Sequence, residues 1–372
     1  MDNSYFLFTT QDTPITIERL HICSWEFRNS SSLIEFGCEI DVTECHRKNS
    51  IKLELYIPWL TNGCIPKDLY HNLKDSSNSK FIFNDSVNNT LSLDGGQNSF
   101  GVIHEFSARN KLCILPIRLN RKPERKILEI IVDLTRYHHL EDKSKPNIYF
   151  RFYLEPIISA ISIRKTGINK STIIYDIKIN ERRNLPEIVS SDLAEKKLCR
   201  IASCFCLNVV PNSYDLTFLD TVSLRSVRTL EYDSFNRYLS DKRVERDELI
   251  VVFSKKVSKV EDENPSFAFF AIFYKERIGA GQFALAVLIN LICGILLFIP
   301  AFRESNHISK WSFEIIHKLP IELYLALGIG VFLLMYFIWP IILIKFNSLI
   351  YWFKDLKKER DESIIRYKYH NP

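Results

Sequence analysis

Two long uncharged runs stand out in the pattern of hydrophobic and polar positions. Residues 278–302 hold no charged side chain over 25 positions, and residues 323–344 hold none over 22. A helix needs about 20 apolar residues to cross the hydrocarbon core of a bilayer, where its backbone must satisfy its own hydrogen bonds. The pattern predicts an α-helical transmembrane hairpin, with an external loop at 303–322. The alternative is a pair of buried helices in a large soluble domain.

The chain before these runs has a pattern with a period of two. Residues 52–57 read Lys-Leu-Glu-Leu-Tyr-Ile, so apolar side chains alternate with polar ones. Such alternation is typical of a strand with one buried face. Clusters of turn-forming residues, for example at 75–79, separate the strand-like segments, and no long helical pattern interrupts them. We therefore predict a mainly β region, folded as an antiparallel sandwich or barrel, or as two of them.

The β region divides near residue 156. Residues 1–156 are predicted to form a β-rich domain, and residues 157–274 form either a second β-rich region or the completion of the first. No internal repeat relates the two stretches. The pattern alone leaves both alternatives open.

The segment 267–274, Phe-Ala-Phe-Phe-Ala-Ile-Phe-Tyr, precedes the first uncharged run. It is too short to cross a bilayer. We interpret it as the last strand of the β region rather than an aromatic segment at the bilayer surface. Either interpretation brings the soluble region close to the membrane, because Lys-Glu-Arg at 275–277 leads directly into the run.

Basic residues near the two runs are distributed unequally. Five lie shortly before the first run, three lie in the loop 303–322, and seven lie in the tail 345–372. Lys and Arg concentrate on the cytoplasmic side of membrane proteins. This predicts a multi-pass protein of the inner (cell) membrane, with both termini and the β region in the cytoplasm.

Composition excludes several functional classes. The net charge is only +5, from 49 basic and 44 acidic residues, which is no general signature of polyanion binding. The nine cysteines show neither a dense framework nor the spacing of a metal site, so we expect reduced thiols and no metal. The Gly-x-Ser-x-Gly, His-Glu-x-x-His and Walker motifs are absent. We predict that the chain is not an enzyme and needs no cofactor.

A small and polar face follows the first predicted transmembrane helix. Gln282, Ala286, Asn290 and Gly294 recur every four residues, which places them on one side of a helix. Such a face serves either as a contact between helices or as the wall of a pore built from several copies. Two helices cannot enclose a channel alone, so a pore implies a homo-oligomer.

Basic residues in predicted turns are candidates for binding an anionic ligand, because a rigid β scaffold can hold them around a phosphate. They fall in three clusters: Arg121, Lys122, Arg125 and Lys126; Arg164, Lys165 and Lys170; Arg182 and Arg183. The alternative is that these side chains are merely solvated or face an anionic membrane.

The order of these parts resembles the Hailong-type membrane effectors of bacterial antiphage systems. The resemblance covers the plan of the chain, a soluble domain followed by two transmembrane helices and a basic tail, and no single functional residue. It implies that the soluble domain reads a nucleotide or oligonucleotide and that the membrane part then opens or disrupts the bilayer during antiviral defence. The alternative function is a membrane-anchored scaffold or adaptor that recruits proteins without forming a pore.

Overall fold

The computed structural model divides the chain into two compact units, Met1–Thr166 with Ser171–Lys275, and Gly167–Lys170 with Glu276–Pro372. The structure describes residues 3–9, 15–27, 32–45, 49–93, 100–140, 145–157, 161–167, 170–192, 196–219, 224–229, 231–244, 249–258, 265–276, 280–305, 320–321, 323–335 and 337–339. Strands make up 48% of the chain and form two sheets, so the protein is mainly β, as predicted.

The first sheet has nine described strands, in the order β16-β19-β13-β1-β4-β10-β9, with β12 beside β13 and β14 beside β1. Their bounds are β1 (Ser4–Thr9), β4 (Ser50–Tyr56), β9 (Ile117–Lys122), β10 (Ile127–Asp133), β12 (Ile163–Thr166), β13 (Lys170–Ile179), β14 (Lys197–Leu198), β16 (Asp215–Leu219) and β19 (Phe267–Glu276). Strands from before and after residue 157 therefore share this sheet.

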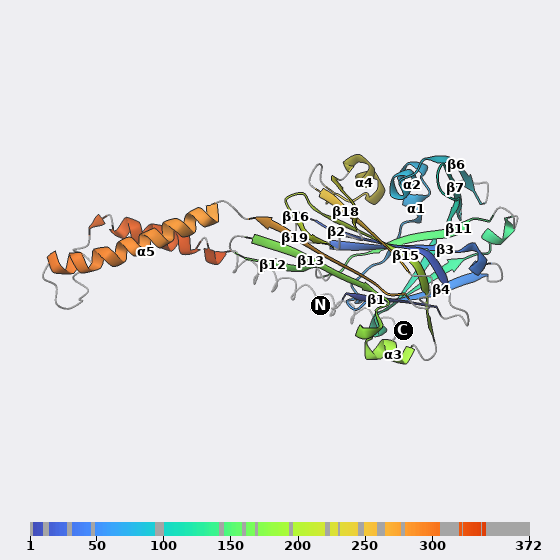
Figure 1. The fold of residues 1–372 in the computed structure, drawn as a ribbon, viewed down its shortest axis with the longest axis horizontal. Coiled ribbons are helices and arrows are strands. Elements are labelled where there is room, and N and C mark those ends of the chain that lie inside the picture. The colour runs from blue at the N-terminus through green and yellow to red at the C-terminus, as the bar shows by residue number, and fades with distance from the viewer. Residues whose placement is uncertain are drawn as a thin grey trace, which may run out of the picture. The chain divides into compact units, whose positions relative to one another are not determined.

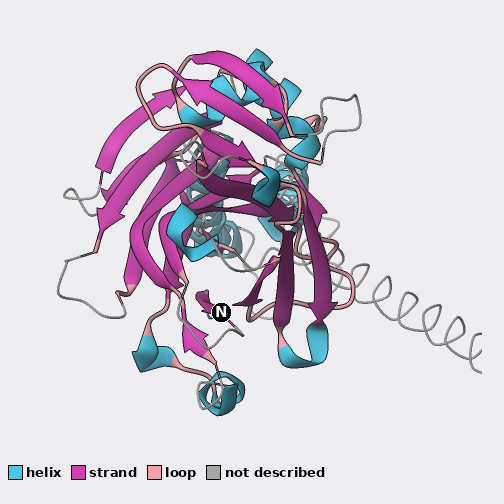
Figure 2. Cartoon of the chain, turned by 90° about the vertical axis from the view of Figure 1, so that its right-hand side faces the viewer, coloured by secondary structure: helices cyan, strands magenta, loops and turns pink. Residues whose placement is uncertain are grey.

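The second sheet has ten described strands, in the order β17-β18-β15-β2-β3-β11-β8-β7-β6, with β5 beside β11. Their bounds are β2 (Thr16–Glu26), β3 (Ser32–Ile40), β5 (Lys67–Asp68), β6 (Val87–Ser92), β7 (Val102–Phe106), β8 (Leu112–Ile114), β11 (Asn147–Leu154), β15 (Arg200–Pro211), β17 (Leu224–Thr229) and β18 (Leu249–Val257). Figure 2 shows the long strands of both sheets with the short helices at their margins.

Both sheets are mixed, whereas an antiparallel fold was predicted. β1 runs parallel to β13, β2 to β15 and β11 to β8. The β2–β15 pair is long, extending from Thr16 opposite Arg200 to Trp25 opposite Val209. The prediction was wrong for these pairs because alternation shows which face of a strand is buried but carries no information about its direction.

One hydrophobic cluster draws buried side chains from both sheets. Tyr5 of β1 and Phe36 of β3, which belong to different sheets, lie with their ring centroids 5.3 Å apart. β1 is buried on its other face too, where Phe6 and Phe8 pack with Val189 of α3 (Glu187–Asp192). The first strand of the chain is thus an interior element, which explains its nearly continuous apolar sequence.

Three short helices pack on the outer face of the ten-stranded sheet: α1 (Tyr70–Leu73), α2 (Ser76–Phe83) and α4 (Tyr232–Leu239) (Figure 1). Asp75 caps α2 by accepting a hydrogen bond from the backbone N–H of Ser77 at 2.8 Å. The ring of Phe235 in α4 lies 5.2 Å from Trp25 and 4.3 Å from Phe81, measured between centroids. This aromatic packing joins α4 to both α2 and the sheet.

The second unit contains α5 (Ala280–Ser305), whose segment Phe283–Phe302 is long and apolar enough to cross a membrane. Among the described residues it is the one helix of that kind. Leu323–Trp339 is also apolar and helical but shorter, and residues 340–344 of the second predicted span lie outside the described part of the chain. So do residues 306–319 of the predicted loop and the whole tail 345–372.

Candidate functional site

The first predicted basic cluster uses most of its charge on nearby parts of the β domain. Arg121 donates to the backbone oxygen of Cys64 at 2.8 Å, and Lys126 donates to that of Leu60 at 2.9 Å. Lys122 lies 3.1 Å from the Glu129 carboxylate. Arg125 belongs to the same turn, in the short helix η2 (Pro123–Arg125). These contacts fix the β9–β10 hairpin. They leave fewer donor groups of these basic side chains available to a ligand.

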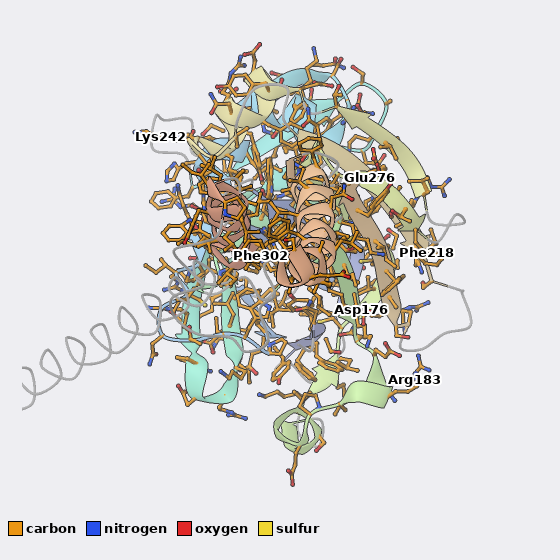
Figure 3. All side chains as sticks on the ribbon, turned by 90° about the vertical axis from the view of Figure 1, so that its left-hand side faces the viewer. Asp176, Arg183, Phe218, Lys242, Glu276 and Phe302 are labelled. Atoms are coloured by element: carbon orange, nitrogen blue, oxygen red, sulfur yellow. The ribbon has the colours of Figure 1, made fainter. Side chains whose placement is uncertain are left out.

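The other two predicted clusters lie in turns that flank β13. Arg164 of β12 lies 3.0 Å from the buried Glu26 carboxylate, while Lys165 and Lys170 are exposed. After β13, Arg182 is exposed and Arg183 forms an ion pair with Glu181; Arg183 is labelled in Figure 3. The three clusters therefore occupy separate turns.

A denser group of polar side chains lies on the outer face of β2, β3 and β11. The register places Arg19 opposite Glu39, His21 opposite Gly37 and Cys23 opposite Glu35. Tyr149 and Arg151 of β11 extend the same face, next to Glu39 and Gly37. Because residues two apart on a strand share a face, these side chains form one continuous surface.

The part of this face beneath α4 is a buried ion pair with a complete shell of partners. Arg151 Nε donates to Glu35 Oε2 at 2.6 Å, and the side chains of both residues are almost fully buried. Trp25 Nε1 donates to Glu35 Oε1 at 2.7 Å, and the Tyr238 hydroxyl donates to Oε2 at 2.9 Å. Removing one partner of such a pair costs about 3–5 kcal/mol, since the other charge is left buried.

His21 lies next along the face, half-buried, with Nδ1 3.2 Å from the Tyr149 hydroxyl. Burial lowers the pKa of His21 well below 6.5, and the positive charges of Arg151 and Arg109 lower it further. Burial also raises the pKa of Tyr149 to about 12. Both groups are therefore neutral at physiological pH.

The outer end of the face carries a second charge group, around Glu39. Arg109 Nη2 donates to Glu39 Oε2 at 2.9 Å, and Asn147 donates to Oε1 at 3.1 Å. Arg19 reaches the same carboxylate at 3.7 Å with a side chain that is 41% exposed. Arg109 also lies over the ring of Phe83, 4.7 Å from its centroid, which holds it in place.

Aromatic rings and a further cation continue this surface onto β15 and β18. The Phe205 ring lies 4.9 Å from His21 and stacks on Phe253 at 5.9 Å, between centroids. Lys255 Nζ lies 5.1 Å from the centroid of Phe205. All of these side chains are partly exposed. We call the surface the ring-and-cation face and define it by Arg19, His21, Phe205, Phe253 and Lys255.

Sequence reasoning missed the ring-and-cation face, because its members lie up to 236 positions apart in the chain. The available signal was weak. It consists of two short stretches in which alternate residues are polar or aromatic, Arg19 and His21 in β2 and Phe253 and Lys255 in β18. Only the β2–β15–β18 pairing brings them together.

Metal and thiol chemistry have no support among the described residues. They contain no group of three or more His, Cys, Asp or Glu side chains that is able to hold a metal ion. The thiols of the β domain whose burial the structure describes are buried. Burial raises the pKa of Cys206 to about 12, so this thiol stays protonated and is a poor nucleophile.

The predicted polar face of α5 is exposed along most of its described length. Ala286 and Asn290 are exposed, and the side chain of Gln282 lies outside the described residues. A Cβ added at Gly294 would meet no atom within 4 Å. Gly294 borders a groove of about 270 Å³, which is lined by Leu291, Gly294, Ile295, Phe298, Pro320, Leu323 and Ala326. The residues from Pro320 onward belong to the segment of the shorter helix, so the groove lies between that segment and α5. Closer contact follows at Gly330, where an added Cβ would lie 3.4 Å from Leu291.

Fold and site together define a mainly β protein with a polar and aromatic sheet face and an apolar C-terminal helix. No protein-family model matches the sequence, and the search of curated proteins finds no match either. The functional argument therefore depends on the geometry of this chain.

Proposed function

We propose that this chain is a membrane-anchored sensor-effector. Its β domain, whose two sheets form the layers of a sandwich in the cytoplasm, binds a signal. Its C-terminal helices form a hairpin in the inner membrane, and several copies assemble there to open a pore or disrupt the bilayer. By its resemblance in plan, the response belongs to antiphage defence and the signal is a nucleotide or oligonucleotide.

One observation carries the membrane part of the proposal. In the most apolar 18-residue stretch of Phe283–Phe302, only 11% of the stretch is buried inside the protein. A core helix of a soluble domain would bury most of these side chains, whereas Leu297 is 77% exposed and Phe283 is 75% exposed. Exposing so much apolar surface to water is unfavourable by roughly 25 cal/mol per Å², so a lipid environment is the natural one.

The sequence supports a second transmembrane helix and cytoplasmic termini, partly through residues that the structure does not describe. Leu323–Trp339 is apolar, and the uncharged run continues to residue 344, which gives a length sufficient to span a bilayer. The excess of basic residues before the first helix and after the second favours cytoplasmic termini.

Assembly into a homo-oligomer is supported by the exposed amide of Asn290. A polar side chain in hydrocarbon seeks a hydrogen-bond partner on another helix or in water. Since no described residue covers the side chain of Asn290, we expect a second copy to supply that partner. The same face then either holds the copies together or lines the passage between them.

The ring-and-cation face is the part of the β domain best suited to read a nucleotide. Bases stack on aromatic side chains, at about 1–3 kcal/mol per base, and cations contact phosphates. Phe205 and His21 supply rings, while Lys255 and Arg19 supply charge at the open side. Glu39, however, neutralises part of the charge of Arg19. A nucleotide with one base and few phosphate groups therefore fits this face better than a polyanion does.

Ion flux through proteoliposomes tests the proposal. Full-length protein is reconstituted with a potential-sensitive dye, and the potential is followed with and without short oligonucleotides and mononucleotides. We expect a change of flux in either direction on ligand addition. An assembled protein that never alters the potential would instead support the scaffold or adaptor.

A matched pair of variants assigns the signal site. Phe205→Ala with Lys255→Ala removes a ring and a cation of the ring-and-cation face, whereas Arg182→Ala with Arg183→Ala changes a predicted turn cluster. If the face binds the signal, only the first pair abolishes the response to ligand while leaving assembly unchanged.

A further inference from the structure

The outer face of the nine-stranded sheet carries exposed aromatic side chains near its β16 edge. Phe218 of β16 is 52% exposed and Phe270 of β19 is 39% exposed, and their ring centroids lie 5.8 Å apart. Phe218 pairs with Ile272 across the two strands. Phe218 is labelled in Figure 3.

The apolar surface continues across the neighbouring strands. Ile163 of β12 is 37% exposed and lies opposite Ile174 of β13, which is partly exposed on the same side. We call this surface the aromatic face and define it by Phe218, Phe270, Ile272, Ile174 and Ile163. Exposed apolar patches rimmed by polar residues mark interaction sites.

The pattern of β19 shows that this surface is more than a chance exposure. Phe267, Phe269, Ala271 and Phe273 alternate into the hydrophobic core. The residues between them point to the other side, yet they are Ala268, Phe270, Ile272 and Tyr274, none of which is charged. A strand with one face in water is expected to alternate apolar and polar residues. β19 is apolar on both faces, so its outer face needs an apolar partner.

Chain connectivity indicates what that partner is. Only residues 277–279 connect the end of β19 at Glu276 with the start of α5 at Ala280. Four fully extended residue steps reach at most about 14 Å. If α5 is inserted in the bilayer, the end of β19 is held close to the lipid headgroups.

The charges around the aromatic face also suit contact with lipid headgroups. Lys165 of β12 is exposed and lies opposite Thr172 on the outer side of the sheet. Lys178 of β13 lies on the same outer side of its strand as Ile174, 3.3 Å from Asp176. Basic side chains near anionic headgroups contribute about 1 kcal/mol each, and aromatic side chains concentrate at the membrane interface. Lys165 thus acquires a role other than ligand binding.

We propose that the aromatic face rests on the headgroup region of the inner leaflet and holds the β domain against the membrane. The inference depends on the membrane anchoring that we propose for α5, but on neither the pore nor the signal. Its consequence is a fixed orientation, in which the domain lies on the bilayer and does not swing from the connection at 277–279.

Site-specific photo-crosslinking to lipid tests the contact. A benzoyl-phenylalanine replaces Phe218 or Phe270 in the full-length protein, and the protein is reconstituted in vesicles of phosphatidylglycerol and phosphatidylethanolamine with a tagged phospholipid. The photoreactive residue keeps an aromatic ring at each position, and its extra benzoyl group has room because Phe218 and Phe270 are exposed. Leu91 of β6, which is 47% exposed on the other sheet, is the matched control, and Phe283 of α5 is the membrane control.

We expect lipid adducts at Phe218 and Phe270 with yields close to that at Phe283, and little adduct at Leu91. Adducts at Phe283 alone would overturn this inference and leave the membrane anchoring standing. Absence of lipid adducts at Phe218, Phe270 and Phe283 alike would contradict the membrane anchoring itself. Protein–protein adducts at Phe218 or Phe270, without lipid adducts, would show that a second copy or another protein covers the face and would refute a lipid contact.

Discussion

At the scale of single residues, Gly37 is the most constrained position of the polar sheet face. A Cβ built there would lie 2.1 Å from the Tyr149 hydroxyl oxygen and 3.4 Å from Cβ of His21. The missing side chain makes room for the Tyr149 hydroxyl between His21 and Arg151.

Gly37→Ala is therefore expected to destabilise the β domain by about 1–3 kcal/mol, because the overpacked tyrosine must move and loses its hydrogen bonds. Urea unfolding of the full-length protein in detergent measures the change. Gly167→Ala is the control, since its Cβ would meet nothing closer than 3.4 Å. Equal stability of the two variants would contradict the role of Gly37.

His21 gives the stability a dependence on pH. Its pKa in the folded protein is lowered well below 6.5, chiefly by burial, so the unfolded chain takes up the proton first. The contribution of neutral His21 to the free energy of unfolding is complete above pH 6.5. It is lost as the pH falls toward the pKa of His21 in the folded protein, by at most about 1.4 kcal/mol per pH unit. His104, whose pKa burial also lowers, adds in the same direction.

We expect His21→Asn to weaken the acid dependence of the free energy of unfolding, measured at pH of about 7.5 and about 5.5. Asn keeps a hydrogen-bonding group near the Tyr149 hydroxyl but does not titrate. An unchanged slope would mean that His21 is accessible to protons in the folded state.

Two buried serines of the same region differ in their partners. Ser24 donates to Asn208 Oδ1 at 2.7 Å, whereas the hydroxyl of Ser254 has no partner among the described residues. Both side chains are 1% exposed.

An unsatisfied buried hydroxyl costs about 1–3 kcal/mol. Ser254→Ala is thus expected to raise the free energy of unfolding by about 1 kcal/mol, and Ser24→Ala to lower it by a similar amount. Denaturant titration of the two variants side by side checks both signs. Destabilisation by Ser254→Ala would indicate that this hydroxyl has a bound partner, such as water.

At the scale of elements, the structure gives two glycines of the helical unit different surroundings. Gly330 approaches Leu291 of α5, where an added Cβ would lie 3.4 Å from a leucine methyl group. Gly294 has open space.

Gly330→Leu is expected to separate the two helices and to lower protein stability in the membrane. Gly294→Leu instead places its side chain in the groove of about 270 Å³ beside Leu323, where there is room for it, and, if the polar face joins copies, reduces the assembled fraction. Crosslinking in vesicles, combined with thermal unfolding, distinguishes the two effects. A loss of stability without loss of assembly for Gly294→Leu would contradict contact between copies at this face.

The sequence predicted element types better than element partners. The segment 267–274 was interpreted as a strand, and β19 confirms it. The first uncharged run contains α5 from Ala280 onward, because length and the absence of charge are sufficient to define such a helix. The glycine contacts were beyond reach, since they depend on the angle at which two helices meet.

At the scale of the whole molecule, the two stretches on either side of residue 157 are interleaved. β1 lies between β4 and β13, and β2 lies between β3 and β15. Strand propensity and alternation describe each stretch by itself, so the sequence left open whether there are one or two domains. The Glu35–Arg151 pair lies within the first stretch, but its members are 116 positions apart, and alternation does not show which strands are neighbours.

Residues 1–156 are accordingly not expected to fold alone. Without β13 and β15, the parallel partners of β1 and β2 are missing and apolar core residues such as Tyr5 lose part of their cover. Circular dichroism and proteolysis of this fragment, compared with residues 1–276, measure the difference. A protease-resistant fragment with native sheet content would contradict the interleaving.

The position of β19 links the folding of the sheet to the order in which the ribosome makes the chain. β19 is an interior strand, between β16 and β13, and among the described strands it is the last one synthesised. At about 5–20 residues per second, α5 is complete only a few seconds later. Until β19 is in place, β13 and β16 have unpaired edges, and by then the ribosome is already making the apolar helix α5. If α5 enters the membrane as we propose, the sheet closes while the nascent chain is being captured there, and translation speed at residues 277–305 sets how much time folding has before insertion tethers the domain.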